Sequence, residues 1–94
     1  MNMSAYIVVE GTPRDKEALS RYASQAIASM KTFGGEVIVF GPWELLVGEG
    51  AYHNGMIIRF PDKRAALEWY NSPTYQALVD IRNTALDCRI RLVG

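Results

Sequence analysis

Arg82 is the residue of this chain best suited to bind an anionic organic molecule. It lies on or beside an apolar stripe that contains Tyr75, Leu78 and Leu86. A guanidinium in such a place needs a carbonyl, a carboxylate or a bound anion as its partner. The functional interpretation is an anchor for the carboxylate or enolate of a small substrate. The interpretation that we favour is an internal brace to a loop or to a carboxylate. The candidate carboxylates are those of Asp62, Glu68 and Asp87.

Three aromatic residues complete the candidate ligand-binding set of Trp69, Tyr70, Tyr75 and Arg82. Tyr70 and Tyr75 carry hydroxyl groups near a break between two expected helices and could donate hydrogen bonds to a ligand. They serve equally well as core aromatics with a polar tip. Trp69 is interpreted most simply as a large side chain of the core or of a cleft wall.

The single histidine, His53, lies in an expected loop beside Tyr52 and Asn54. Histidine ionises near neutral pH, so this position could supply an acid or a base. A lone histidine in a loop is more often solvated, and we do not expect it to ligate haem. His53, Tyr75 and Arg82 are therefore weak catalytic candidates, and the sequence does not decide whether the protein is an enzyme.

The spacing of polar residues disfavours other kinds of site. No cysteine, second histidine or acidic pair stands at metal-ligand spacing from His53, so we predict no metal site. Gly48 and Gly50 lack the third glycine and the strand-to-helix context of a dinucleotide-binding fingerprint. Neither a nucleophile elbow nor a phosphate-binding loop is visible. We predict no cofactor.

The composition is that of one globular domain, residues 1–94, with a core from about residue 4 to residue 94. Hydrophobic residues make up 49% and charged residues 21% of the chain. Ten basic and ten acidic residues balance, which argues against nucleic acid or a membrane surface as a partner. No signal peptide or membrane-spanning run is visible. Cys88 is the only cysteine, and we expect a cytoplasmic protein.

Apolar runs predict strands at residues 4–10, 36–40, 56–60 and 87–93. Gly11 is expected to end the first strand, and Asn54-Gly55 is expected to lie in a turn. Trp43 to Val47 is expected to be an added short strand, either a hairpin partner or a kinked continuation of the second strand. The sequence leaves that choice open.

The helix signals predict one helix between the first two strands and a split helix before the last one. Thr12 and Pro13 read as the N-cap and first position of the first helix, which Gly34-Gly35 should end with one glycine in the left-handed conformation. A second helix should start after Asp62 and halt at Asn71. It should then restart at Ser72 and run to about residue 86. The order β-α-β-β-α-β predicts an α+β, ferredoxin-like antiparallel sheet with helices on one face.

Both faces of this expected sheet are apolar, because the runs at residues 6–9 and 37–40 do not alternate with polar residues. The helices can cover only one face, so we predict that the other packs against a second copy in a two-fold homodimer. Alternation in the last two strands places Arg59, Arg89 and Arg91 on the dimer side. They could pair across the interface or line an anion pocket, and we favour pairing. The acids available for pairing are Glu10, Glu36 and Glu44, and the residues expected to face the helices are Met56, Ile58, Phe60, Cys88, Ile90 and Leu92.

The segment Trp69-Tyr70-Asn71-Ser72-Pro73-Thr74-Tyr75-Gln76, with Arg82 and Ala85 behind it, is the most specific motif of the chain. Together with the opening residues 5–8, Gly34-Gly35 and Phe60-Pro61, it makes the chain resemble the domain of unknown function 1330 family, in the dimeric α/β-barrel superfamily. The resemblance covers residues 4–94, and Thr74 departs from it because the family more often has an acid there. It implies fold and dimerisation. The wider superfamily is similar in architecture to cofactor-independent monooxygenases, small isomerases, decarboxylases and haem enzymes, but a shared fold does not carry function.

Two functions are compatible with these residues. In the first, a cleft between sheet and helices binds an anionic organic acid or a phenol, which Arg82 holds and the two tyrosines orient, while Trp69 and Phe60 exclude water. Turnover there would be cofactor-free proton transfer or oxygen-dependent oxidation. In the alternative, the protein is a non-catalytic structural or binding dimer.

Overall fold

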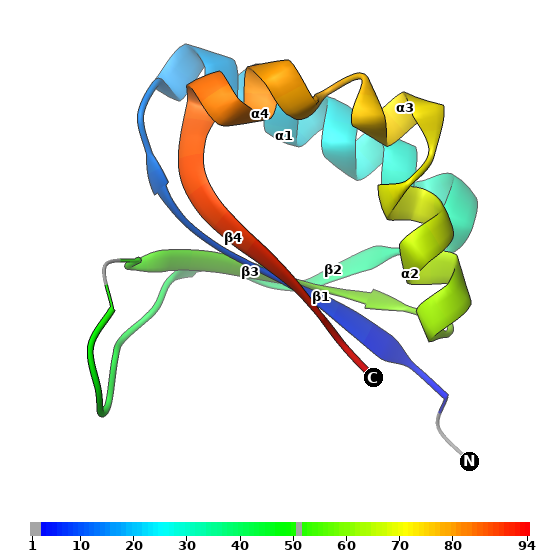
Figure 1. Cartoon of the computed structure of the whole chain (residues 1–94), viewed down its shortest axis with the longest axis horizontal. Helices are drawn as coiled ribbons and strands as arrows, with labels where there is room; N and C mark the ends of the chain where they lie inside the picture. The colour runs from blue at the N-terminus through cyan, green and yellow to red at the C-terminus, as the bar shows by residue number, and fades with distance from the viewer. Residues whose placement is uncertain (1–2, 51) are drawn as a thin grey trace.

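A four-stranded antiparallel sheet carries all the helices on one face (Figure 1), in a computed structural model that describes residues 3–50 and 52–94. The strand order is β2-β3-β1-β4. The strands are β1 (Ala5–Pro13), β2 (Glu36–Pro42), β3 (Asn54–Phe60) and β4 (Leu86–Val93). The helices are α1 (Lys16–Met30), the 3-10 helix η1 (Lys31–Phe33), α2 (Lys63–Tyr70), α3 (Pro73–Gln76) and α4 (Val79–Ala85). The α+β, ferredoxin-like expectation is confirmed.

Strand β1 is longer than the sequence predicted. Gly11 does not end it, because pairing with β4 continues from Gly11–Cys88 to Pro13–Leu86. A Cβ atom on Gly11 would lie 3.1 Å from the Leu86 side chain, so a glycine lets the two strands approach closely here. The prediction of Thr12 as N-cap of α1 is therefore wrong. Asp15 is the N-cap, and its side chain accepts a hydrogen bond from the Ala18 amide at 3.0 Å.

Two other predicted helix boundaries, one C-terminal and one N-terminal, are confirmed by their caps. Gly34, after η1, has a φ of 78°, which is the left-handed conformation expected of one member of the glycine pair. Asp62 is the N-cap of α2 and accepts a hydrogen bond from the Ala65 amide at 2.8 Å. These caps depend on residues within one helical turn, so the sequence around them is sufficient to predict them.

The connection between β2 and β3 is an irregular loop over its described residues, 43–50 and 52–53, rather than an added strand. The expectation for Trp43 to Val47 is therefore wrong in both of its forms. β2 instead continues through Gly41 to Pro42, opposite Asn54 and Gly55 of β3, so the predicted turn at Asn54-Gly55 is also wrong. The Trp43 amide donates to the carbonyl of His53 at 2.9 Å and draws the two ends of the loop together.

The core lies between the sheet and the helices. Ile58 and Phe60 face the helices as predicted, with exposed fractions of 2% and 0%, and Met56, Cys88, Ile90 and Leu92 pack against the same core. Trp69 stands at its centre, with its ring centroid 5.5 Å from that of Phe60. The Trp69 indole N–H donates to Ser29 Oγ at 2.9 Å, so its polar atom is satisfied in the interior.

The outer face of the sheet, on the side away from the helices, combines apolar side chains with ion pairs. The strand register places Tyr6, Val8 and Glu10 of β1 on this face, together with Arg59, Arg89 and Arg91. Arg59 pairs with Glu36, and Glu10 lies 3.3 Å from both Arg89 and Arg91. These arginines therefore have acidic partners within their own chain. No described ion pair involves Glu44.

Candidate functional site

Ser72 fixes the corner between α2 and α3 and thereby positions the candidate site. Its Oγ accepts a hydrogen bond from the Tyr75 amide at 3.2 Å and donates one to the Trp69 carbonyl at 2.7 Å. The restart of the helix at Ser72 is confirmed. Its end at about residue 86 is confirmed, because α4 ends at Ala85, but the expected single helix is wrong, since α3 ends at Gln76 and α4 spans Val79–Ala85.

The structure brings the four predicted ligand-binding residues together. Arg82 Nη1 donates to the Tyr75 hydroxyl at 3.2 Å and to the Tyr70 hydroxyl at 3.4 Å. Tyr75 is fully buried, and its ring centroid lies 4.4 Å from that of Trp69. Trp69, Tyr70, Tyr75 and Arg82 therefore form one contiguous group on the helical layer.

Arg82 keeps its charge without any of the carboxylates expected to brace it. Asp62 caps α2, Glu68 pairs with Arg64 at 3.0 Å, and Asp87 pairs with Arg14 at 3.8 Å. No carboxylate in the described part of the chain forms a salt bridge with Arg82. Burial opposes the charge, but hydrogen bonds to Tyr75 and Tyr70 outweigh that effect and raise the pKa of the guanidinium.

Tyr22 belongs to this group, although the sequence did not single it out. Its hydroxyl lies 2.7 Å from the Tyr75 hydroxyl, and the two rings meet edge to face. Burial, together with the neighbouring Tyr75, raises the pKa of Tyr22 and keeps it protonated. The available signal was a phenolic hydroxyl on the buried stripe of α1, between Ala18 and Ala26. The donor cluster, as we call it, is Tyr22, Tyr70, Tyr75 and Arg82.

A cavity of about 370 Å³ lies between α1 and the sheet. Tyr22 and Trp69 are in its wall, whereas Tyr70, Tyr75 and Arg82 are not among its lining residues. Most of the wall is apolar, and Phe40 of β2 must lie at its rim because that side chain is 74% exposed. Other lining residues are Leu19, Ala23, Ala26, Ile27, Met30 and Met56.

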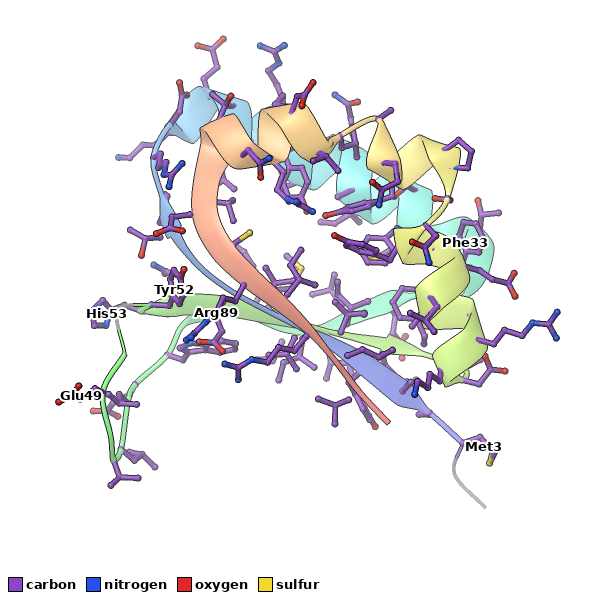
Figure 2. The ribbon with its side chains drawn as sticks, viewed as in Figure 1. Met3, Phe33, Glu49, Tyr52, His53 and Arg89 are labelled. Carbon is purple, nitrogen blue, oxygen red and sulfur yellow. The ribbon has the colours of Figure 1, made fainter. Side chains whose placement is uncertain are left out.

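His53 and Phe60 lie outside this arrangement. His53 is exposed, and Figure 2 shows it beside Tyr52 at the end of the sheet from which the β2–β3 loop departs. No hydrogen bond or ion pair connects its side chain to Tyr75 or Arg82 within the described residues. Phe60 is buried against Trp69 and does not line the cavity. Among the described residues, no three His, Cys, Asp or Glu side chains group as metal ligands would.

These features define a ferredoxin-like α+β domain with an apolar cavity and a donor cluster beside it. The chain belongs to the family described as Domain of unknown function (DUF1330), whose model matches residues 4–94. No curated protein matches the chain. No helix in the described residues is long and apolar enough to span a bilayer.

Three solved structures show the same fold. A protein of unknown function from Rhodopseudomonas palustris has a TM-score of 0.79 at 21% identity, with 99% of this chain and 82% of that chain covered. SnoaB, a cofactor-independent oxygenase from Streptomyces nogalater, has a TM-score of 0.70 at 11% identity, covering 97% and 91%. A dimeric ferredoxin-like protein of unknown function from Jannaschia sp. CCS1 has a TM-score of 0.66 at 19% identity, covering 97% and 98%.

Proposed function

We propose that the protein is a homodimer in which each protomer binds a small, mostly apolar organic molecule with an anionic or phenolic oxygen. The observation that carries this proposal is the apolar cavity of about 370 Å³ with Tyr22 of the donor cluster in its wall. A cavity of this size and lining suits an aromatic ring with few polar substituents. The phenol of the sequence-based hypothesis fits it better than a strongly hydrated carboxylic acid does.

The hydrogen-bond chemistry of the donor cluster favours a ligand that accepts hydrogen bonds. Arg82 already occupies a lone pair on the hydroxyls of Tyr70 and Tyr75. The contact between Tyr22 and Tyr75 uses one phenolic proton. Two of the three phenolic protons therefore have no acceptor inside the cluster, and the nearby guanidinium carries a positive charge. A ligand oxygen beside Tyr22 would supply an acceptor for one of these two protons.

The homodimer is supported by the outer face of the sheet, where Val8, Ile57 and Val39 share one side of adjacent strands. The helices lie on the opposite side (Figure 1), so this surface has no cover within its own protomer. Several proteins of similar fold are described as dimeric, including those from Jannaschia and Thermobifida fusca. We also propose a cytoplasmic location, on the ground that the chain has a single cysteine.

The alternative function is a structural or binding dimer without turnover. It is favoured by the position of Arg82, which is held by protein hydroxyls and is not among the residues lining the cavity. Of the three weak catalytic candidates, only Tyr75 and Arg82 belong to the donor cluster. Proton transfer at a ligand oxygen in the cavity would involve Tyr22 directly, and Tyr75 and Arg82 through their hydrogen bonds to it and to each other, before His53.

Calorimetric titration with 4-nitrophenol and with nitrobenzene tests the proposed site, because the two probes differ only in the phenolic oxygen. We expect 4-nitrophenol to bind more tightly, and Tyr22→Phe to reduce that preference. Ala23→Leu, which fills the cavity, should weaken both probes by at least about tenfold, or about 1.4 kcal/mol. The matched control is Ala28→Leu on the exposed side of α1, which should bind normally.

The outcomes separate the parts of the proposal. Failure of both probes to bind, or binding that Ala23→Leu leaves unchanged, would remove the cavity as the site. Equal affinity for the two probes would remove recognition of the oxygen and would leave Arg82 as a brace.

A further inference from the structure

The exposed large apolar side chains gather in two neighbouring places. In β2, the exposed fractions are 36% for Val37, 50% for Ile38 and Val39, and 74% for Phe40. In the β2–β3 loop, Leu45 is 52% exposed, and Leu46 and Val47 are each 88% exposed. Elsewhere in the described residues such side chains occur singly, at Met3, Leu67 and Val93. Two apolar patches of this kind on one chain indicate contact surfaces.

The two ends of the loop are fixed by contacts with the sheet, so its apolar tip, residues 45–47, has a defined direction. At one end, the Trp43 indole lies against Gly55, where it occupies the place that a Cβ atom would take. At the other end, Tyr52 donates from its hydroxyl to Asp87 Oδ1 at 3.2 Å, and its ring lies 4.9 Å from the Arg89 guanidinium carbon. Figures 1 and 2 show the loop extending from the end of the sheet toward the side opposite the helices. The tip is thus held on the side of the outer face.

A second copy of the chain is the partner that best fits this tip. In a two-fold dimer through the outer faces, each copy offers an apolar tip and an apolar β2. The tip of each copy can therefore pack on β2 of the other, and the symmetry forms this contact two times. A lipid surface fits less well, because Glu44 and Glu49 flank the apolar tip and would be repelled by anionic headgroups. Figure 2 shows Glu49 on the projecting part of the loop.

We propose that residues 45–47 of each copy pack on β2 of the other copy, over Phe40, and close the rim of its cavity. This inference rests on the homodimer and the cavity of the proposed function. β2 is an edge strand, so a loop from the partner can reach Phe40 around that edge. The cavity is then complete only in the dimer, and ligand affinity depends on dimerisation.

Disulfide cross-linking between copies tests this contact, with Cys88→Ala as the background because Cys88 is the only cysteine. Proteins carrying Val47→Cys and Phe40→Cys are mixed and oxidised. We expect a cross-linked dimer from the mixture and little from either protein alone. Cross-linking of Val47→Cys with itself in preference to the mixture would mean that the two tips meet each other, and would overturn the proposal.

Sedimentation equilibrium provides the second measurement. The double substitution Leu46→Asp with Val47→Asp should raise the dimer dissociation constant by at least about tenfold. The control Leu67→Asp, on the helical layer, should leave it unchanged. A wild-type monomer would overturn both this contact and the proposed dimer. A wild-type dimer unaffected by the double substitution would overturn the contact alone.

Discussion

A charged guanidinium surrounded by phenolic hydroxyls is the most unusual chemical feature of the molecule. Arginine inside a protein is normally neutralised by a carboxylate, which compensates for the loss of hydration. Arg82 instead donates to Tyr70 and Tyr75, while Asp62, Glu68 and Asp87 are engaged elsewhere. The cost of this arrangement is limited, because Arg82 is only partly buried. As a consequence, the positive charge of Arg82 is linked to the cavity wall by hydrogen bonds through Tyr75 and Tyr22.

Because of Tyr22, the free energy of unfolding of the protein should depend on pH in the alkaline range. Its pKa is raised in the folded state by burial and by Tyr75, whereas an unfolded tyrosine ionises at about pH 10. The stabilisation is therefore complete below about pH 10 and is lost as the pH rises above it. Cys88, whose pKa is also raised by burial, acts with the same sign at lower pH and is removed with Cys88→Ala.

Urea denaturation at a series of pH values measures this effect. In the Cys88→Ala background, the free energy of unfolding should fall from pH 9 to 11, a range set by the roughly pH 10 ionisation of free tyrosine. Adding Tyr22→Phe should flatten that fall, at a cost of about 1 kcal/mol at neutral pH for the lost hydrogen bond. An equally steep fall with Tyr22→Phe would assign the alkaline sensitivity to another group.

At the scale of the elements, Ser72 is the residue on which the geometry of the site depends. Ser72→Ala removes both the cap of α3 and the bond to the Trp69 carbonyl, so we expect a loss of about 1–2 kcal/mol in the free energy of unfolding. Ser24→Ala, on the exposed side of α1, is the matched control and should change it by less than about 0.5 kcal/mol. Chemical denaturation measures both. Equal effects would show that the corner does not depend on the cap.

The helix caps at Asp62, Ser72 and Gly34 could be predicted from the sequence, whereas the start of α1 and the C-terminal end of β1 could not. Asp62, Ser72 and Gly34 act on backbone groups within one turn, so local residues are enough. The end of β1 depends instead on a partner strand far along the chain, which pairs with Thr12 and Pro13 and overrides their helix-start signal. The same reason applies to the β2–β3 loop: its apolar residues resemble a strand, but they pair with no strand among the described residues.

The candidate site could likewise be predicted only where its residues are close together in the sequence. The spacing of Tyr75 and Arg82, with Ser72 as a cap, placed them on one side of a short helix, and Tyr70 at the preceding helix end completes the group. Tyr22 could not be found in this way, because its contact with Tyr75 joins residues 53 positions apart. The cavity likewise arises from packing α1 against the sheet, and no local pattern encodes it.

At the scale of the whole molecule, the outer face combines a hydrophobic surface with charges that must remain paired when it is covered. Glu10 is the central acid, with a side chain only 17% exposed and an arginine on either side at 3.3 Å. Arg89 and Arg91 are 51% and 57% exposed in the single chain, so a partner copy would bury much of what is still hydrated. Charges that matter little at a surface matter more once they are desolvated.

Glu10→Gln should therefore weaken the proposed dimer far more than it destabilises the protomer. Without the carboxylate, two arginines in each copy would enter the interface uncompensated, so we expect the dimer dissociation constant to rise at least about tenfold. Glu68→Gln, which breaks the exposed pair with Arg64 on α2, is the control and should leave dimerisation unchanged. Sedimentation equilibrium gives the constants and urea denaturation the protomer stability. An unchanged dissociation constant for Glu10→Gln would mean that the arginines stay hydrated and that the dimer, if formed, uses another surface.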